Sequence, residues 1–129
     1  MTSPVFLELL DVLEIHQNLV DLYGGQAGVR DLSLLQSALA MPLAGLDGAY
    51  FHSDLYEMAA AYLFHLIKNH PFIDGNKRTA LGCALVFLDL NDIEINADEE
   101  GLYQMTIASA DGRLDKPAIA KFFRESPVK

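Results

Sequence analysis

The sequence has little of what stabilises small secreted proteins or anchors proteins in membranes. It contains one cysteine, Cys83, so no disulfide can form within the chain. Cys83 lies in an apolar run, which favours a buried and unreactive thiol. The longest stretch without a charged residue, Leu32–Leu46, has 15 residues and includes a proline. Because such a stretch is too short and too polar to span a bilayer, we expect no membrane association.

The N-terminal region also lacks the features of a signal peptide. Glu8 and Asp11 fall where a signal peptide would be purely apolar. A chain of 129 residues with 51% hydrophobic and 21% charged residues is typical of one compact globular domain. We therefore expect a single domain over residues 1–129 that stays in the cytoplasm.

Basic residues are scarce, and their distribution is uneven. The chain has 9 lysines and arginines against 18 aspartates and glutamates, which gives a net charge of −9. This balance argues against nucleic-acid binding by the chain itself, because such binding needs a basic face. Between Asp31 and Gly112 the only basic residues are Lys68, Lys77 and Arg78. The positive charge of the middle of the chain is therefore concentrated in one short region.

The spacing of apolar residues predicts an all-α fold, with about six helices around a buried central helix. The expected helices cover residues 9–23, 31–39, 54–67, the central apolar run 80–90, 98–109 and 116–125. Asp31 is a candidate N-cap, and Asp54 with Glu57 has the spacing of a capping box. Between these helices, Pro42–Ser53 is expected to form a loop or small hairpin, and Ile93–Asn96 one short strand.

Two cations occupy an unusual place in the segment His-Pro-Phe-Ile-Asp-Gly-Asn-Lys-Arg, residues 70–78. Lys77 and Arg78 fall in the first turn of the central helix, where the helix dipole disfavours positive charge by roughly a few tenths of a kcal/mol. A bound anion would favour them, because the free N–H groups of Gly75–Arg78 and both cationic side chains would converge on it. Gly75 has no Cβ and lets the backbone approach a ligand closely. The segment therefore predicts a phosphate-binding site.

The same segment supplies a base and a metal ligand beside that site. His70 can accept a proton near neutral pH. Asp74 offers a carboxylate suited to Mg²⁺ and is also a candidate N-cap for the central helix. These groups fit phosphoryl or nucleotidyl transfer, in which catalysis is mostly positioning and charge neutralisation.

Other uses of the histidines are open. A single histidine between two helices often packs or caps, and His16 is expected to pack on the apolar face of its helix. His65, His70 and Asp74 could supply three ligands to a transition metal. The spacing is poor, because metalloprotease helices place two histidines four residues apart. His52, in the expected hairpin, is expected to be exposed.

The segment 70–78 resembles the signature of the Fic/Doc superfamily, whose general form is HPFx[DE]GNGRxxR. The departures are Lys77, where the adenylyltransferase members have glycine, and Leu81, where they have a second arginine. Both departures point to the Doc branch. The likeness to that branch covers nearly the whole chain and includes Glu14–His16, Tyr23–Gly25, Leu34, Leu35, Ala38 and Asn76–Leu81.

The resemblance implies an all-α Fic fold in which a flap, here residues 43–52, aligns a target polypeptide beside the motif. Doc proteins are toxins of toxin-antitoxin modules, and their activity is transfer of the ATP γ-phosphate to a threonine of elongation factor Tu, which halts translation. By position, His70 would be the general base, and Asp74 would hold Mg²⁺ and help to orient the histidine. The ATP phosphates would be bound by Gly75, Asn76, Lys77 and Arg78.

Two alternatives to the kinase activity are open. A Fic-type enzyme would transfer AMP to a protein hydroxyl, and a degenerate member would serve only as a binding module. Lys77 in place of glycine changes the phosphate cradle, and Leu81 in place of arginine removes a phosphate clamp. ATP should therefore bind here in a different way from its binding in the adenylyltransferases.

Inhibition within the chain is the less favoured expectation. Ser53–Glu57 matches the first half of an inhibitory-helix pattern, but Met58 breaks it and the capping box explains the segment. Inhibition is therefore expected from a partner. The resemblance to Doc proteins implies that this partner is a Phd-type antitoxin, whose disordered tail would fold into a helix on an apolar groove.

Overall fold

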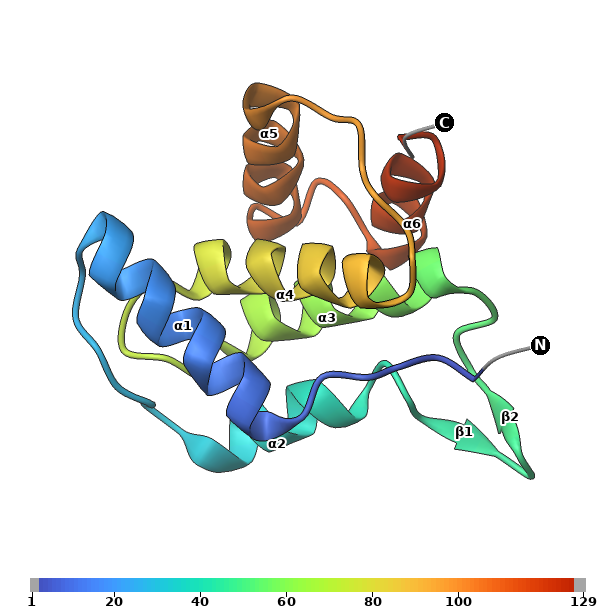
Figure 1. Cartoon of the computed structure of the whole chain (residues 1–129), viewed down its shortest axis with the longest axis horizontal. Coiled ribbons are helices and arrows are strands. Elements are labelled where there is room, and N and C mark those ends of the chain that lie inside the picture. The colour runs from blue at the N-terminus through green and yellow to red at the C-terminus, as the bar shows by residue number, and fades with distance from the viewer. Residues whose placement is uncertain (1–2, 127–129) are drawn as a thin grey trace.

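The structure, a computed structural model, describes residues 3–126 and is mostly helical, which confirms the expected all-α fold. Its elements in order are α1 (Leu9–Tyr23), α2 (Leu32–Ala40), β1 (Gly45–Leu46), β2 (Ala49–Tyr50), α3 (Leu55–Asn69), α4 (Asn76–Leu90), α5 (Glu99–Ala110) and α6 (Lys116–Arg124). Helices α3 and α4 lie at the centre, with α1 and α2 on one side and α5 and α6 on the other (Figure 1). Over residues 3–126, every helix falls short of the length and apolar character needed to cross a membrane.

The starts of α2 and α3 follow from local side-chain caps. The carboxylate of Asp31 accepts the main-chain N–H of Leu34 at 3.0 Å, and that of Asp54 accepts the N–H of Glu57 at 2.8 Å. The Glu57 carboxylate in turn accepts both the main-chain N–H and the hydroxyl of Ser53, at 3.0 and 2.9 Å. These bonds confirm Asp54 as the N-cap, although Glu57 reaches back to Ser53 and not, as in a capping box, to the N–H of Asp54.

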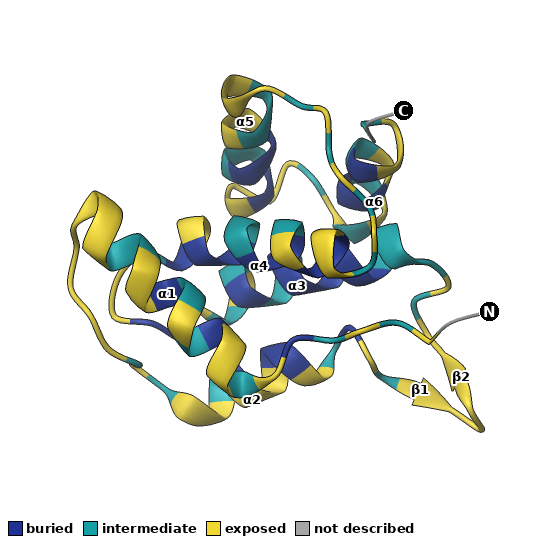
Figure 2. Cartoon of the chain, in the orientation of Figure 1, coloured by how far each residue is buried: buried dark blue, intermediate teal, exposed yellow. Residues whose placement is uncertain are grey.

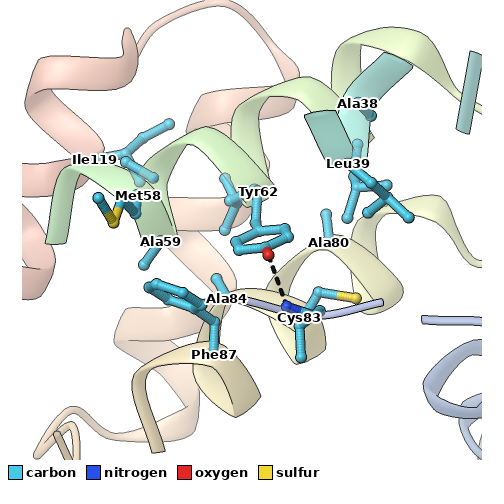
Figure 3. Close-up of a cluster of buried hydrophobic side chains, with 14 of the residues drawn as sticks. Ala38, Leu39, Met58, Ala59, Tyr62, Ala80, Cys83, Ala84, Phe87 and Ile119 are labelled. Carbon is cyan, nitrogen blue, oxygen red and sulfur yellow. Dashed lines mark hydrogen bonds between the residues drawn. The ribbon is translucent and has the colours of Figure 1, made fainter. Parts of the chain in front are cut away.

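The core lies mainly between α3 and α4, where Figure 2 shows the darkest faces of both helices turned toward each other. The rings of Tyr62 and Phe87 pack with centroids 5.1 Å apart (Figure 3). The Tyr62 hydroxyl accepts the N–H of Leu7 at 2.9 Å, and burial raises the pKa of this tyrosine to about 12. Cys83 is fully buried beside them, as expected, and burial raises the pKa of its thiol.

The hairpin forms where it was expected, but far from the motif. Strands β1 and β2 pair antiparallel within the segment 42–53. They precede the start of α3 (Figure 1). His70 follows the end of this 15-residue helix, and a helix of that length spans about 22 Å. Among the described residues, none from 43–52 lines the cavity around His70. The position of the hairpin therefore argues against the flap role that the resemblance implied.

The strand expected at Ile93–Asn96 is reduced to a single β-bridge at Ile95, and no longer strand forms there among residues 3–126. The main-chain N–H of Asn96 donates instead to the carbonyl of Ser126, near the end of the described chain. A longer strand needs a partner along its whole length for pairing. The segment is therefore an extended connection with one bridged residue.

His52 and His65, which lie outside the motif, both contact the side chain of Lys116. Lys116 Nζ lies 3.2 Å from Nε2 of His52 and 2.9 Å from Nε2 of His65. His52 is consequently half-buried, and the expectation that it would be exposed is wrong. Burial, reinforced by the charge of Lys116, lowers the pKa of His65 to about 4.

The low pKa of His65 predicts a pH-dependent stability. Its ordinary pKa is 6.5, so between pH 6.5 and 4 the unfolded chain binds a proton that the folded chain does not. The free energy of unfolding is therefore highest above pH 6.5, where His65 is neutral in both states, and it decreases as the pH falls toward 4. We expect the thermal midpoint of wild type to drop between pH 7 and pH 5, and His65→Gln to show a smaller drop. An equal drop in both proteins would contradict this cause.

Candidate active site

The loop between α3 and α4 reverses the chain sharply at His70. His70 ends α3 in the left-handed conformation, with φ 50° and ψ 54°. This conformation costs a non-glycine residue on the order of 1 kcal/mol, and the following Pro71 disfavours helical dihedrals further. Gly75, also left-handed with φ 75°, then begins α4. The reversal places the histidine at the N-terminal end of α4.

A buried ring pair holds the middle of this loop. Phe72 is fully buried and stacks on the ring of His16, with centroids 3.9 Å apart and an interplanar angle of 10°. His16 Nε2 donates to the Asp74 carbonyl at 2.8 Å. His16 is therefore packed, as expected, and it helps to fix the main chain of the loop.

Asn76 contributes its side chain to the loop itself. Its Oδ1 accepts the N–H of Phe72 at 2.9 Å, and its Nδ2 donates to the carbonyl of the same residue at 3.0 Å. The residue is only 6% exposed. Its side chain is thus engaged within the protein, so Asn76 can contact a phosphate only through its main-chain N–H. The sequence did not distinguish these two uses.

Asn76→Ala should therefore destabilise the fold. Removing the amide leaves the buried N–H and carbonyl of Phe72 unpaired, which costs about 2–4 kcal/mol for the two groups. We expect the midpoint of urea unfolding to fall accordingly. Asn18→Ala, which removes an exposed amide in the middle of α1, serves for comparison. A stability loss as small as that of Asn18→Ala would contradict the assigned role.

Asp74 is held as an ionised carboxylate at the edge of the site. Its two oxygens accept the N–H groups of Gln26 at 3.2 Å and Gly75 at 2.9 Å, and these bonds lower its pKa. The expectation that Asp74 caps α4 is wrong, because the left-handed Gly75 occupies the N-cap position. Gly25 leaves room for this carboxylate, because a Cβ at position 25 would lie 2.9 Å from Asp74 Oδ2, which is too close.

The N-terminus of α4 has the expected character of an anion site. Within residues 3–126 no side chain caps it, so the N–H groups of Asn76, Lys77 and Arg78 have no partner in the chain. The N–H of Gly75 was also expected to be free. This expectation is wrong, because the carboxylate of Asp74 accepts it. Both cationic side chains are exposed, and the guanidinium of Arg78 lies over the ring of Tyr23 at 4.6 Å.

A cavity of about 720 Å³ joins these groups, and its volume lies in the range of small-molecule and cofactor sites. It is lined by all the residues expected from the sequence: His70, Asp74, Gly75, Asn76, Lys77 and Arg78. The rest of the lining is mostly apolar and comes from Ile67 of α3 and from Leu102, Tyr103, Ile107 and Ala110 of α5, although α5 also contributes Glu99 and Thr106. One wall can therefore bind phosphates and the other a less polar part of the ligand.

The donor set fits Mg²⁺ but not a transition metal. Mg²⁺ is usually held by one or two carboxylates together with substrate phosphates and waters, and Asp74 supplies an ionised carboxylate in this cavity. His65 contacts Lys116 and does not line the cavity with His70. In the described part of the chain, no three histidine, cysteine or acidic residues could together hold a metal ion. The transition-metal alternative is therefore wrong.

Comparison with known proteins agrees with this geometry. A model of the Fic/DOC family matches residues 6–88. The chain belongs to the Fic/DOC family. The family match ends within α4, after the whole of the motif loop, while the apolar wall from α5 lies beyond it.

The relatives found lie on the Doc side of the Fic/DOC family. The chain is 31% identical over 115 residues to "Protein kinase doc" of Escherichia phage P1, an alignment that covers 88% of this chain and 89% of that protein. It is 43% identical over 76 residues to "Toxin Doc" of Mycolicibacterium smegmatis, covering 59% of this chain and 58% of that toxin. These matches support the Doc toxin branch.

Proposed function

We propose that this protein is a Doc-type toxin that transfers the γ-phosphate of ATP to a threonine hydroxyl of elongation factor Tu, and so blocks translation. The observation that carries the proposal is the uncapped N-terminus of α4, where two cations lie beside His70 and Asp74 in one cavity. The name of the phage P1 relative, a protein kinase, supports phosphate transfer. The site of action would be the cytoplasm.

In this reaction His70 accepts the proton of the threonine hydroxyl as its oxygen attacks the γ-phosphorus. The bond to the β,γ-bridging oxygen breaks, ADP leaves, and the histidine later releases its proton to solvent. His70 is exposed at the cavity and lies at the end of a rigid helix. Such placement suits a base that meets a large protein substrate.

The phosphates would bind the N-terminal turn of α4. Lys77 and Arg78 supply charge, and the N–H groups of residues 76–78 supply hydrogen bonds, in a direction that the helix dipole favours. Asp74 would hold Mg²⁺, which when bound supplies positive charge to the phosphates. Stacking on Tyr23 restrains Arg78 before ATP arrives, which reduces the entropy lost on binding.

The side chain at position 81 favours phosphate transfer over AMP transfer. Leu81 lines the cavity where the adenylyltransferase pattern has an arginine. An apolar side chain cannot clamp a phosphate bidentately, so the nucleotide should lie differently against α4. Transfer of AMP is the second candidate, and a binding module without activity is the third.

A Phd-type antitoxin is the proposed inhibitor. An adjoining groove of about 650 Å³ runs between α1, α4 and α5, and its apolar lining includes Leu19, Leu81, Leu85 and Tyr103. An antitoxin tail that folds as an amphipathic helix could bind there. Because Arg78 and Leu81 line both the groove and the cavity, a peptide in the groove would also hinder ATP.

The mass of the target tests the proposal. The protein is incubated with elongation factor Tu, Mg²⁺ and ATP, and the intact target is then weighed. A gain of one phosphate supports the kinase, whereas a gain of AMP would favour the second candidate. An unchanged target would reject this target or the activity. A reaction without Mg²⁺ is the control.

A further inference from the structure

Arg30 holds the end of α3 in an unusual way. Its Nε donates to the carbonyl of His70 at 2.8 Å, and its Nη2 donates to the carbonyl of Asn69 at 3.0 Å. These two N–H groups lie on one edge of the planar guanidinium and point in parallel. Among the described residues Arg30 forms no salt bridge, so its charge faces main-chain carbonyls at the negative end of a helix.

The two carbonyls are those of the peptide planes on either side of the His70 Cα. Since a peptide unit is planar, the relative orientation of two successive planes is given by φ and ψ of the residue between them. A rigid fork that binds both oxygens therefore restrains both dihedrals of His70. The N–H groups of Arg30 and Asp31 also donate to the next carbonyl, that of Pro71, at 2.7 and 3.1 Å.

His70 needs such restraint. Its φ of 50° lies in the left-handed region, which disfavours residues with a Cβ. It also precedes Pro71, and a residue in that place is biased toward extended dihedrals. Without an external restraint the main chain would shift toward other conformations, and the imidazole would move with the Cα to which it is attached.

We infer that Arg30 is a positioning residue that holds the His70 main chain in its left-handed conformation and so aims the imidazole into the cavity. The inference rests on the proposed function for the role of His70 as base. It goes beyond the motif, because Arg30 lies 40 residues before His70 in the sequence and does not line the cavity.

Two variants of the full chain test the inference. Arg30→Met removes both hydrogen bonds but keeps a long apolar side chain. Arg30→Lys keeps the charge and can bind only as a point donor, not as a planar fork. Asp31→Ala is the matched control, because it removes the N-cap of α2 at the adjacent position, which costs roughly 1 kcal/mol, and keeps the side chain of Arg30.

Two readouts are compared: the kinetics of transfer to elongation factor Tu, and the Cα and Cβ chemical shifts of His70. For Arg30→Met we expect the kcat to fall about 100-fold, because a small misplacement of a catalytic group has an effect of this order, with the KM for ATP unchanged within about twofold. The His70 shifts should leave their left-handed values. Arg30→Lys should have a kcat and His70 shifts between those of wild type and Arg30→Met. Asp31→Ala should resemble wild type in both readouts.

The outcomes separate this inference from the proposed function. If His70 keeps left-handed shifts in Arg30→Met, the inference is overturned whether or not the protein is an enzyme. Changed shifts with an unchanged kcat would equally overturn a positioning role, as would an equal loss of kcat in Asp31→Ala. If wild type transfers nothing, the proposed function fails, and changed shifts still support the restraint of His70 by Arg30.

Discussion

Replacing His70 with glycine is expected to leave a folded protein that no longer transfers phosphate. The base accepts the proton of the attacking hydroxyl, and the loss of such a group typically lowers the rate about 10²- to 10⁴-fold. Glycine adopts φ 50° without steric cost, so the strain stored at this position is relieved. We therefore expect the thermal midpoint to stay equal or rise while kcat falls. Transfer assays and thermal unfolding of the same sample measure both.

His70→Asn separates the loss of the base from the change in main-chain strain. Asparagine tolerates the left-handed region better than most residues, and its amide does not accept a proton at neutral pH. It should therefore resemble glycine in activity and wild type in stability. Substantial transfer by either variant would show that another group takes the proton. A large loss of stability in the glycine variant would show instead that the His70 side chain has a structural role.

Asp74→Asn is expected to have the second-largest effect. The amide oxygen can still accept one N–H, but the charge that would bind Mg²⁺ is lost, and a metal supplies several kcal/mol of transition-state stabilisation. This corresponds to a loss of roughly 10²- to 10³-fold in kcat at a fixed Mg²⁺ concentration. The amide NH₂ would also face an N–H of Gln26 or Gly75, where the carboxylate accepts.

The dependence on Mg²⁺ identifies the cause of that loss. If Asp74 holds the metal, the variant should need a higher Mg²⁺ concentration for half-maximal rate, and part of the rate should return at high Mg²⁺. Asp89→Asn removes an exposed carboxylate near the far end of α4 and should leave the curve unchanged. An unshifted curve for Asp74→Asn would place the metal elsewhere or remove it from the reaction.

The helices could be predicted because their signals are local in sequence. Asp31, Asp54 and Asp98 each accept an N–H three residues ahead, and such caps can be found without knowing the tertiary structure. The strand expected at 93–96 is reduced to one β-bridge, because the length of a strand depends on what lies beside it. The hairpin was expected at the correct residues, but its distance from the motif depends on the direction of α3, which only the structure gives.

The candidate site was found from the sequence because most of its polar groups lie in nine consecutive residues. The use of each group was harder to predict. The side chain of Asn76 turns inward to Phe72, and Gly75 rather than Asp74 occupies the N-cap. Neither fact has a signature in composition or spacing, because both follow from the left-handed turn.

The supporting residues were missed altogether. Gly25 was part of the family resemblance, but nothing in the sequence indicated that its lack of a Cβ makes room for Asp74. Gln26 and Arg30 contact the motif across 40 or more residues of sequence, and the apolar wall from α5 lies still farther along the chain. Contacts of this kind are formed only when helices pack, so one sequence without a structure does not reveal them.

The position of the label in ATP tests the central claim most directly. Elongation factor Tu is incubated with the protein, Mg²⁺ and ATP that carries a radioactive label on either the γ- or the α-phosphorus, with His70→Gly as the control. Phosphate transfer predicts a labelled target with γ-labelled ATP, an unlabelled target with α-labelled ATP, and no label in the control. A target labelled from the α-phosphorus, or from neither, would contradict the account.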